Sequence, residues 1–339
     1  MTERKVDHHF LPQSYLRAWS VDGHKVWTYR TLVSHSDVPA WKLQSIRGIA
    51  YHQDLYTRRV EGVDSHEFEE WLDREIETPA AGSLQKAIQG HDLSSEEWAV
   101  LGRFVAAQDL RTPTSYLEMK ERWERTLPDL MNNVLANAVR DLKKGSLRPR
   151  REGRDAFENP RGIFNVDIDS SSAHEDDAAF IRAEVTIGRA LWLEGMKRLL
   201  TRTEGVLGRH TWCLAEAAHD TEWFTTDHPV MKLNFYAADR YDFRGGWGSP
   251  GTEIMMPISR RYLLYTQVGT QRPRRFRFSR GQTFAIQKML AERALRFVFA
   301  ARKIRRVAWH RPRVVDRERF LEEQEQWRKW NEQQGRAEE

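Results

Sequence analysis

The hydrophobic pattern changes its period along the chain, and this change limits the possible folds more than any other feature. In the segment 65–142, apolar side chains recur at helical spacing, as Phe68, Trp71, Leu72 and Ile76 illustrate. Short apolar runs separated by turns replace them later in the sequence. These runs are typical of β-strands and lie at 210–217, 223–226, 230–235, 254–257 and 262–266. A helical block followed by successive short strands predicts an α+β fold, with a helical middle and an antiparallel C-terminal sheet.

The first 60 residues combine a short helix with extended segments. Residues 12–19 are expected to be helical, since Pro12 occupies the tolerated first position. The segment 26–29 alternates like a strand and follows a turn at 21–23. We expect this N-terminal segment to join the C-terminal sheet.

Residues 1–310 are predicted to form a single domain. The stretch 143–178 is rich in Lys, Arg, Gly and Pro and then in Ser and Asp, which predicts a loop or an insertion. Residues 311–339 read as a charged helical tail with few apolar anchors, suited to contact a protein partner. Further local predictions are helices at 178–203 and 283–301 and a short strand at 304–309.

Composition excludes several classes of protein. Hydrophobic residues make up 40% of the chain, which is enough for a core and argues against disorder. Apolar runs fall short of the roughly 20 residues that a membrane helix needs, and no signal peptide is recognisable at the N-terminus. Cys213 is the single cysteine, so neither an internal disulfide nor a Cys-based zinc site is expected. We therefore expect a cytoplasmic protein without a membrane partner.

The charge is modestly basic, with 54 Lys and Arg against 49 Asp and Glu, a net charge of +5. Basic residues gather at 143–151, 272–277 and 302–306. Such patches attract phosphate backbones, which makes nucleic acid a candidate partner. The simpler interpretation is a solvated basic face.

Adjacent histidines open the first candidate site. His8 and His9 directly precede the expected helix start, where unpaired backbone N–H groups favour an anion. A histidine near neutral pH can transfer a proton or bind a metal. The alternative is that the pair only packs or caps.

A second candidate is the strand end at 223–230, where Asp227 precedes His228 and Pro229. Its carboxylate could act as a metal ligand or general base. It could equally bond local backbone N–H groups.

Helical segments supply further polar candidates. Glu70 and Glu77 are two helical turns apart and so share one face, with a solvated acidic edge as the simpler interpretation. Gln108 and Arg111 share a face, and an arginine there could clamp a phosphate or pair with a carboxylate. The sequence lacks the common motifs of P-loop NTPases, dinucleotide-binding proteins, serine hydrolases and zinc proteases.

The order of these motifs resembles the mostly bacterial domain-of-unknown-function family 4238, whose members open with His-His-(aromatic)-x-Pro-x-x-Tyr-Leu. The resemblance covers residues 7–302. The matching segments are 8–16, Asp54-Leu55-Tyr56, Glu70 with Glu77, Arg111-Thr112-Pro113, 224–230 and Met256-Pro257-Ile258-Ser259. His228 and Gln287 stand where the family usually has Asn. The resemblance implies one fold and a site shared by the landmark residues, but no established activity.

Together these residues predict a phosphodiester hydrolase, a nuclease of a bacterial defence or toxin type. His8 or His9 would be general base or metal ligand, Glu77 and Asp227 would supply carboxylate, and Arg111 would steady the phosphate charge. Substrate-binding roles are assigned to Gln108, Asp54 and Ser259. A divalent metal such as Mg²⁺ or Mn²⁺ would suit these ligands.

Two alternatives remain. One is a non-catalytic ligand-sensing or protein-interaction module, in which the same residues pin the N-terminal segment onto the sheet. The other is an enzyme acting on a nucleotide or phosphosugar. A catalytic role predicts groups that converge on an open cleft, whereas a structural role predicts groups that are buried and satisfy one another.

Overall fold

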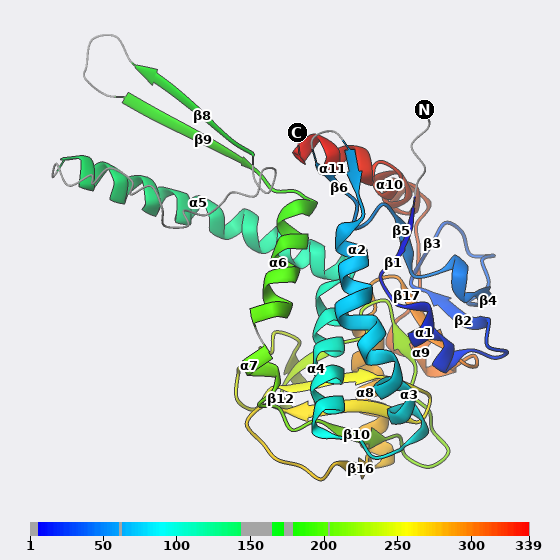
Figure 1. Cartoon of the computed structure of the whole chain (residues 1–339). Coiled ribbons are helices and arrows are strands. Elements are labelled where there is room, and N and C mark those ends of the chain that lie inside the picture. The colour runs from blue at the N-terminus through cyan, green and yellow to red at the C-terminus, as the bar shows by residue number, and fades with distance from the viewer. Residues whose placement is uncertain (1–5, 61–62, 144–164, 173–178, 203, 339) are drawn as a thin grey trace.

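The computed structural model describes residues 6–60, 63–143, 165–172, 179–202 and 204–338. They form the predicted α+β fold, in which helices cover a central sheet (Figure 1). Within this described part of the chain, no helix is long and apolar enough to cross a membrane.

The larger sheet is six-stranded and mainly antiparallel. Its strands, in spatial order, are β13 (Arg240–Asp242), β12 (Met231–Ala237), β14 (Glu253–Pro257), β15 (Tyr262–Gln267), β10 (Cys213–Glu216) and β16 (Arg275–Arg277). Only the β10–β16 pair of this sheet is parallel among the described strands. Successive side chains of a strand point to opposite faces, so Leu214 enters one hydrophobic cluster while Cys213 and Ala215 enter the other. Both faces of the sheet are therefore buried.

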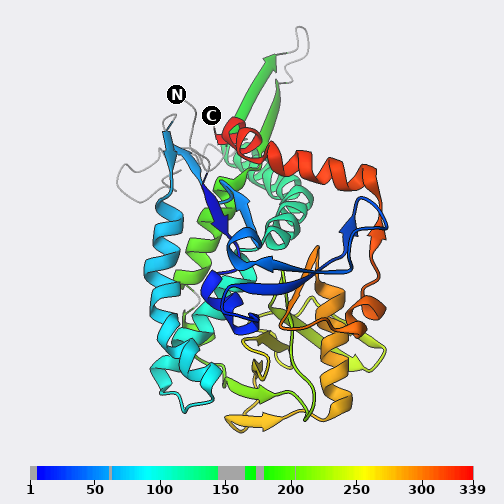
Figure 2. The same cartoon turned by 90° about the vertical axis from the view of Figure 1, so that its right-hand side faces the viewer.

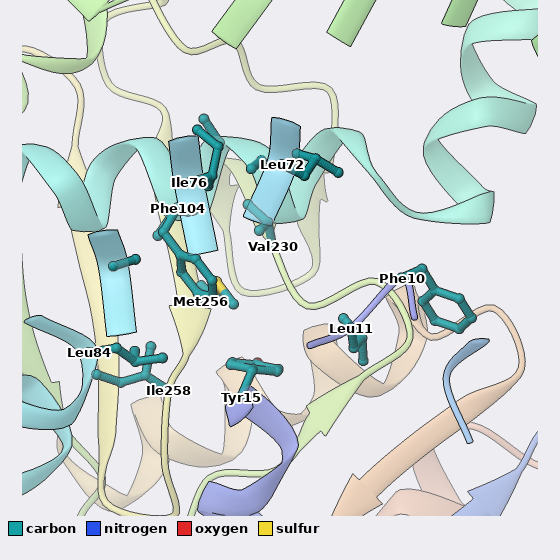
Figure 3. Packing of buried hydrophobic residues seen from close by; sticks show 14 of the residues in the cluster. Phe10, Leu11, Tyr15, Leu72, Ile76, Leu84, Phe104, Val230, Met256 and Ile258 are labelled. Atoms are coloured by element: carbon teal, nitrogen blue, oxygen red, sulfur yellow. The ribbon is translucent and has the colours of Figure 1, made fainter. Parts of the chain in front are cut away.

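A helical layer covers the face that carries Leu214. Its elements are α2 (Glu67–Leu72), the π-helical turn η3 (Asp73–Glu77), α3 (Thr78–Gln89), α4 (Ser95–Leu110), α6 (Arg189–Arg202) and α7 (Glu204–Leu207). Ser94 and Glu97 form a capping box that fixes the start of α4. Figure 3 shows the packed interior, where Phe104 of α4 and Met256 of β14 belong to the same buried cluster as Ile76.

The opposite face of the sheet packs against α8 (Arg280–Arg293), which starts at a capping box of Ser279 and Gln282. Ile286, Met289 and Leu290 enter the cluster that holds Cys213. In Figure 2 the sheet lies between this helix and the α3 side of the molecule.

A second, four-stranded sheet, separate from the six-stranded one, pairs two N-terminal strands with two strands from later in the chain. Its order is β11 (Thr225–Thr226), β17 (Phe297–Ala300), β2 (Lys25–Arg30) and β4 (Trp41–Ser45), with antiparallel neighbours. The short helix α1 (Gln13–Leu16) continues as η1 (Arg17–Trp19) and is tied to the same region. The Tyr15 hydroxyl donates to the Pro257 carbonyl at 2.7 Å and lies 2.6 Å from Thr225 Oγ1.

Short strand pairs complete the N-terminal part. They are β1 (Asp7–His9) with β5 (Tyr51–Gln53), β6 (Arg58–Val60) with β7 (Val63–Ser65), and β3 (Leu32–Val33) with β18 (Val314–Val315). The turn η2 (Ile46–Gly48) connects β4 to β5.

The helix α5 (Pro113–Lys143) and the hairpin β8 (Asn165–Ser172) and β9 (Ala179–Thr186) project from the body (Figure 1). Most of the predicted loop or insertion at 143–178, and most of the basic segment 143–151, lies outside the described residues. The extent of the domain, 1–310, stays a prediction.

The C-terminal segment packs across the N-terminal strands. It contains α9 (Arg305–His310), α10 (Arg317–Arg328) and α11 (Trp330–Glu338), and Figure 2 shows the last two helices above the strands. Trp330 is buried and meets Tyr116 edge to face, with ring centroids 4.8 Å apart. The Arg189 guanidinium donates to the Asn331 side chain at 2.8 Å, which ties α11 to α6.

Three local predictions were wrong. The segment 178–203 contains the strand β9 before α6, and the segment 283–301 contains β17 after α8. The segment 304–309 lies largely in α9 rather than a strand. Its apolar residues Ile304, Val307 and Ala308 follow helical spacing and pack on one cluster, a period that the strand prediction overlooked.

Candidate functional site

His8 lies in β1 and is buried, with 1% of its surface exposed. Its Nδ1 accepts a hydrogen bond from the Tyr56 backbone N–H at 3.0 Å, so the neutral ring carries its proton on Nε2. The ring stacks on Tyr56 at 5.6 Å and meets His66 edge-on. Burial, together with the nearby His66, lowers the pKa of His8 to about 3. The imidazole is therefore neutral at physiological pH.

Arg111 is the central charge of the same region and is also buried. Its Nη1 donates to the Glu77 carboxylate, its Nη2 to the His9 carbonyl at 2.7 Å, and its Nε to the Tyr56 hydroxyl at 3.3 Å. Burial alone would lower the pKa of Arg111, but Glu77 and Tyr56 outweigh it and the pKa is raised. Arg111 thus joins the N-terminal strand to two helices through a permanent positive charge.

Glu69 on α2 is a partly buried carboxyl beside His8. Its Oε2 lies 3.4 Å from His8 Nε2, yet this buried oxygen has no hydrogen-bond partner among the described residues. Burial raises the pKa of Glu69 to about 7, with Arg111 opposing and Glu77 adding to the rise. A carboxyl of this kind can exchange a proton near neutral pH.

The π-helical turn η3 explains why Glu69 rather than Glu70 joins Glu77. A π turn holds about one residue more than an α turn, so a helix face repeats after about eight residues instead of seven. Glu69 and Glu77 fall on the shared face, and Glu70 is exposed. The expected pairing of Glu70 with Glu77 is therefore replaced by Glu69 with Glu77.

His9 belongs to the region through its backbone. Its carbonyl holds Arg111, and its ring lies 5.6 Å from that of Tyr51. Burial lowers the pKa of His9, while a hydrogen bond with the Arg47 backbone partly offsets this effect. The Nε2 atom is buried without a hydrogen-bond partner within the described ranges.

Asp227 lies apart from this cluster and holds a chain reversal. Its Oδ1 accepts from the Leu295 N–H at 2.9 Å, and its Oδ2 accepts from the N–H groups of Arg296 at 2.6 Å and Phe297 at 3.0 Å. Burial raises the pKa of Asp227 to about 6, and these N–H groups moderate the rise. Asp227 therefore bonds to backbone N–H groups, as one of the two alternatives expected. These groups are distant in sequence, however, and not local.

The three residues assigned to substrate binding have separate positions. Asp54 adopts a left-handed backbone with φ of +53°, and its Oδ1 accepts from the Val6 N–H at 3.0 Å. Ser259 Oγ accepts from the Tyr262 N–H at 3.0 Å in the turn before β15. Gln108 is fully buried, and neither of its side-chain amide atoms has a hydrogen-bond partner in the described part of the chain.

His228 belongs to a second polar cluster, which also contains Thr112, Asp109 and Arg293. Its Nδ1 lies 3.3 Å from Thr112 Oγ1, and its Nε2 contacts the Arg293 guanidinium. Asp109 approaches the same Nε2 at 3.9 Å and pairs with Lys232 at 2.6 Å. Burial and the Arg293 charge lower the pKa of His228, so this ring is neutral.

Arginines of the described basic segments pair with acidic side chains of the same chain. Arg275 pairs with Asp92, Arg277 pairs with Glu216, and Arg302 pairs with Glu222. Arg306 stacks on the Phe284 ring at 3.4 Å. Among the described residues, no three His, Cys, Asp or Glu side chains group as metal ligands would.

These features define an α+β protein in which a buried His–Glu–Arg cluster links the N-terminal strand to the helical layer. The chain belongs to the family described as a protein of unknown function (DUF4238), whose model matches residues 7–303. No curated protein and no solved structure matches the chain.

Proposed function

We propose that the protein is a phosphodiester hydrolase whose reaction centre is the cluster of His8, Glu69, Glu77 and Arg111. The observation that carries the proposal is the Glu69 carboxyl, with a pKa of about 7 and an oxygen that is buried without a partner among the described residues. Strongly perturbed acids beside a specific charge are typical of functional sites. The Glu69 side chain is 34% exposed, so part of it contacts solvent.

In this proposal Glu69 is the acid–base group. As a carboxylate it takes a proton from water, whose oxygen attacks phosphorus, and the ester P–O bond breaks. The same carboxyl then returns the proton to the leaving oxygen. His8 is a positioning residue, because its neutral ring places the protonated Nε2 3.4 Å from Glu69 Oε2.

Arg111 contributes electrostatically to the same centre. Three of its five N–H directions are used by Tyr56, Glu77 and the His9 carbonyl. Its positive charge stabilises the added negative charge of the transition state at low dielectric. The proposed steps use these protein groups, and the dependence on Mg²⁺ or Mn²⁺ is part of the test. The nucleic-acid substrate, the defence or toxin setting and the cytoplasmic location remain predictions.

The test uses purified protein with DNA, RNA and nucleotides, each with Mg²⁺, with Mn²⁺ and with chelator. Glu69→Gln keeps the shape of the side chain and removes the acid, so we expect cleavage to fall at least about 100-fold. Glu70→Gln is the matched control, because this neighbour is exposed. Cleavage by Glu69→Gln at the wild-type rate, or no cleavage of any substrate by the wild type, would refute the proposal.

The second candidate is a non-catalytic ligand-sensing or interaction module. The hydrogen bonds of Arg111 favour this module, because its guanidinium already donates to three groups of the protein itself. This alternative predicts that Glu69→Gln alters stability while no phosphodiester is cleaved by either protein.

A further inference from the structure

A cavity of about 590 Å³ lies between the C-terminal helix α10 and the N-terminal strands. This volume is within the range of small-molecule sites, about 300–1,000 Å³. Six ring-bearing side chains line it: Phe10, Tyr51, His52, Phe297, Phe320 and Trp327. Rings of this kind stack on planar bases without selecting one base strongly.

One face of α10 forms the outer wall. Phe320, Glu323, Gln324 and Trp327 line the cavity and have the spacing of a single helix face. Trp327 stacks on His52 with ring centroids 3.8 Å apart, at 15°. Both carboxylate oxygens of Glu323 accept a hydrogen bond from Arg296 Nε at 2.7 Å. The helix is thus fixed at two points beside an open space.

Three arginines line the cavity, and among the described residues only the side chain of Arg30 lacks an ionic partner. Arg328 pairs with Glu325. Arg296 is neutralised by Glu323, and the Asp227 carboxylate is bonded by three backbone N–H groups. The side chain of Arg30, at the end of β2, has no hydrogen bond or ion pair to any described residue, and its Nε is buried. Its guanidinium lies 5.9 Å from the Phe297 ring. A half-buried arginine without a carboxylate favours an anionic guest.

We propose that this cavity binds a nucleoside monophosphate, with the base stacked among the aromatic side chains and the phosphate on Arg30. Gln53, Gln324 and Thr114 line the same space and offer hydrogen-bonding groups for the base edge or the sugar. The site is separate from the Glu69 cluster and does not depend on the proposed hydrolase activity.

The experiment is isothermal titration of the full-length protein with AMP, GMP, CMP and UMP, with the matching nucleosides and with inorganic phosphate. Arg30→Gln should weaken monophosphate binding at least about tenfold and leave nucleoside binding unchanged. Arg125→Gln removes the same charge from an exposed position of α5 and should bind like the wild type. Circular dichroism confirms that each variant is folded.

A second variant tests the aromatic wall independently. Phe320→Ala should weaken nucleosides and nucleotides alike, because it removes a stacking surface without changing the charge. The proposal is overturned if no nucleotide binds at millimolar concentration, or if inorganic phosphate binds as tightly as the nucleotides. It is also overturned if Arg30→Gln binds like Arg125→Gln, or if Phe320→Ala binds like the wild type.

Discussion

The protonation of Glu69 should appear as a pH dependence of folding stability. Its pKa in the folded protein is about 7, above the ordinary value of 4.5, so the native state binds this proton more tightly than the unfolded state does. The corresponding stabilisation is complete below about pH 4.5 and is lost as the pH rises through about 7. Glu69→Gln removes the ionisation and should remove this part of the pH dependence.

The size of the effect follows from the burial of the side chain. The difference between 4.5 and about 7 sets an upper bound of about 3 kcal/mol. Since 34% of the side chain is exposed, solvent screening reduces the energy of the buried charge. We expect a change of about 1–2 kcal/mol between pH 4.5 and 8.

The assay is urea denaturation followed by tryptophan fluorescence across this pH range. The free energy of unfolding of Glu69→Gln, relative to that of the wild type, should rise by this amount as the pH increases. Glu70→Gln should follow the wild type, because Glu70 is exposed. Parallel pH profiles for Glu69→Gln and the wild type would show that the carboxyl is not buried in the way described.

Three further substitutions test the interior. Asp227→Ala leaves three backbone N–H groups without their acceptor. In urea denaturation the free energy of unfolding should fall by about 3–5 kcal/mol. A fall below about 1 kcal/mol would contradict this role of Asp227. Arg111→Met leaves the Glu77 carboxylate without its ionic partner and should lower the free energy of unfolding by about 3–5 kcal/mol. Adding Glu77→Leu should recover much of this loss. Additive losses in this double-mutant cycle would contradict the coupling of the two residues. Trp330→Ala should cost about 3 kcal/mol, and an unchanged melting temperature would mean that α11 does not contribute to the fold.

Local periodicity was sufficient to predict the main elements. The long helix after Thr112 and the strands from Cys213 onwards follow from spacing and turn residues that lie within each segment. The prediction that Glu70 and Glu77 share one helix face was wrong because it assumed regular α-helical turns. A single π turn at Asp73–Glu77 shifts the phase by about one residue and brings Glu69 inward. Nothing in the spacing of the apolar residues alone reveals such a turn.

The environment of Asp227 could not be predicted from its neighbours. The N–H groups that it accepts from belong to Leu295, Arg296 and Phe297, which lie 68 to 70 residues further along the chain. The sequence left a reactive carboxylate and a backbone-bonding carboxylate as equal alternatives. Only the antiparallel pairing of β11 with β17 brings those donors to the carboxylate. Glu69 was likewise missed, because its burial beside His8 depends on a segment far away in the sequence.

The two proposed sites differ in whether the family match covers all of their residues. The His8, Glu69, Glu77 and Arg111 cluster lies entirely within residues 7–303, which the family model matches. The outer wall of the cavity comes from α10, which begins at Arg317, beyond that match. A substitution in the cluster should therefore affect a property of the family domain, whereas a substitution on the cavity face of α10 should affect a property that depends on the C-terminal segment. Phe320→Ala and Glu69→Gln provide this comparison in one protein, and nucleotide binding that responded to Glu69→Gln but not to Phe320→Ala would place the ligand in the cluster instead.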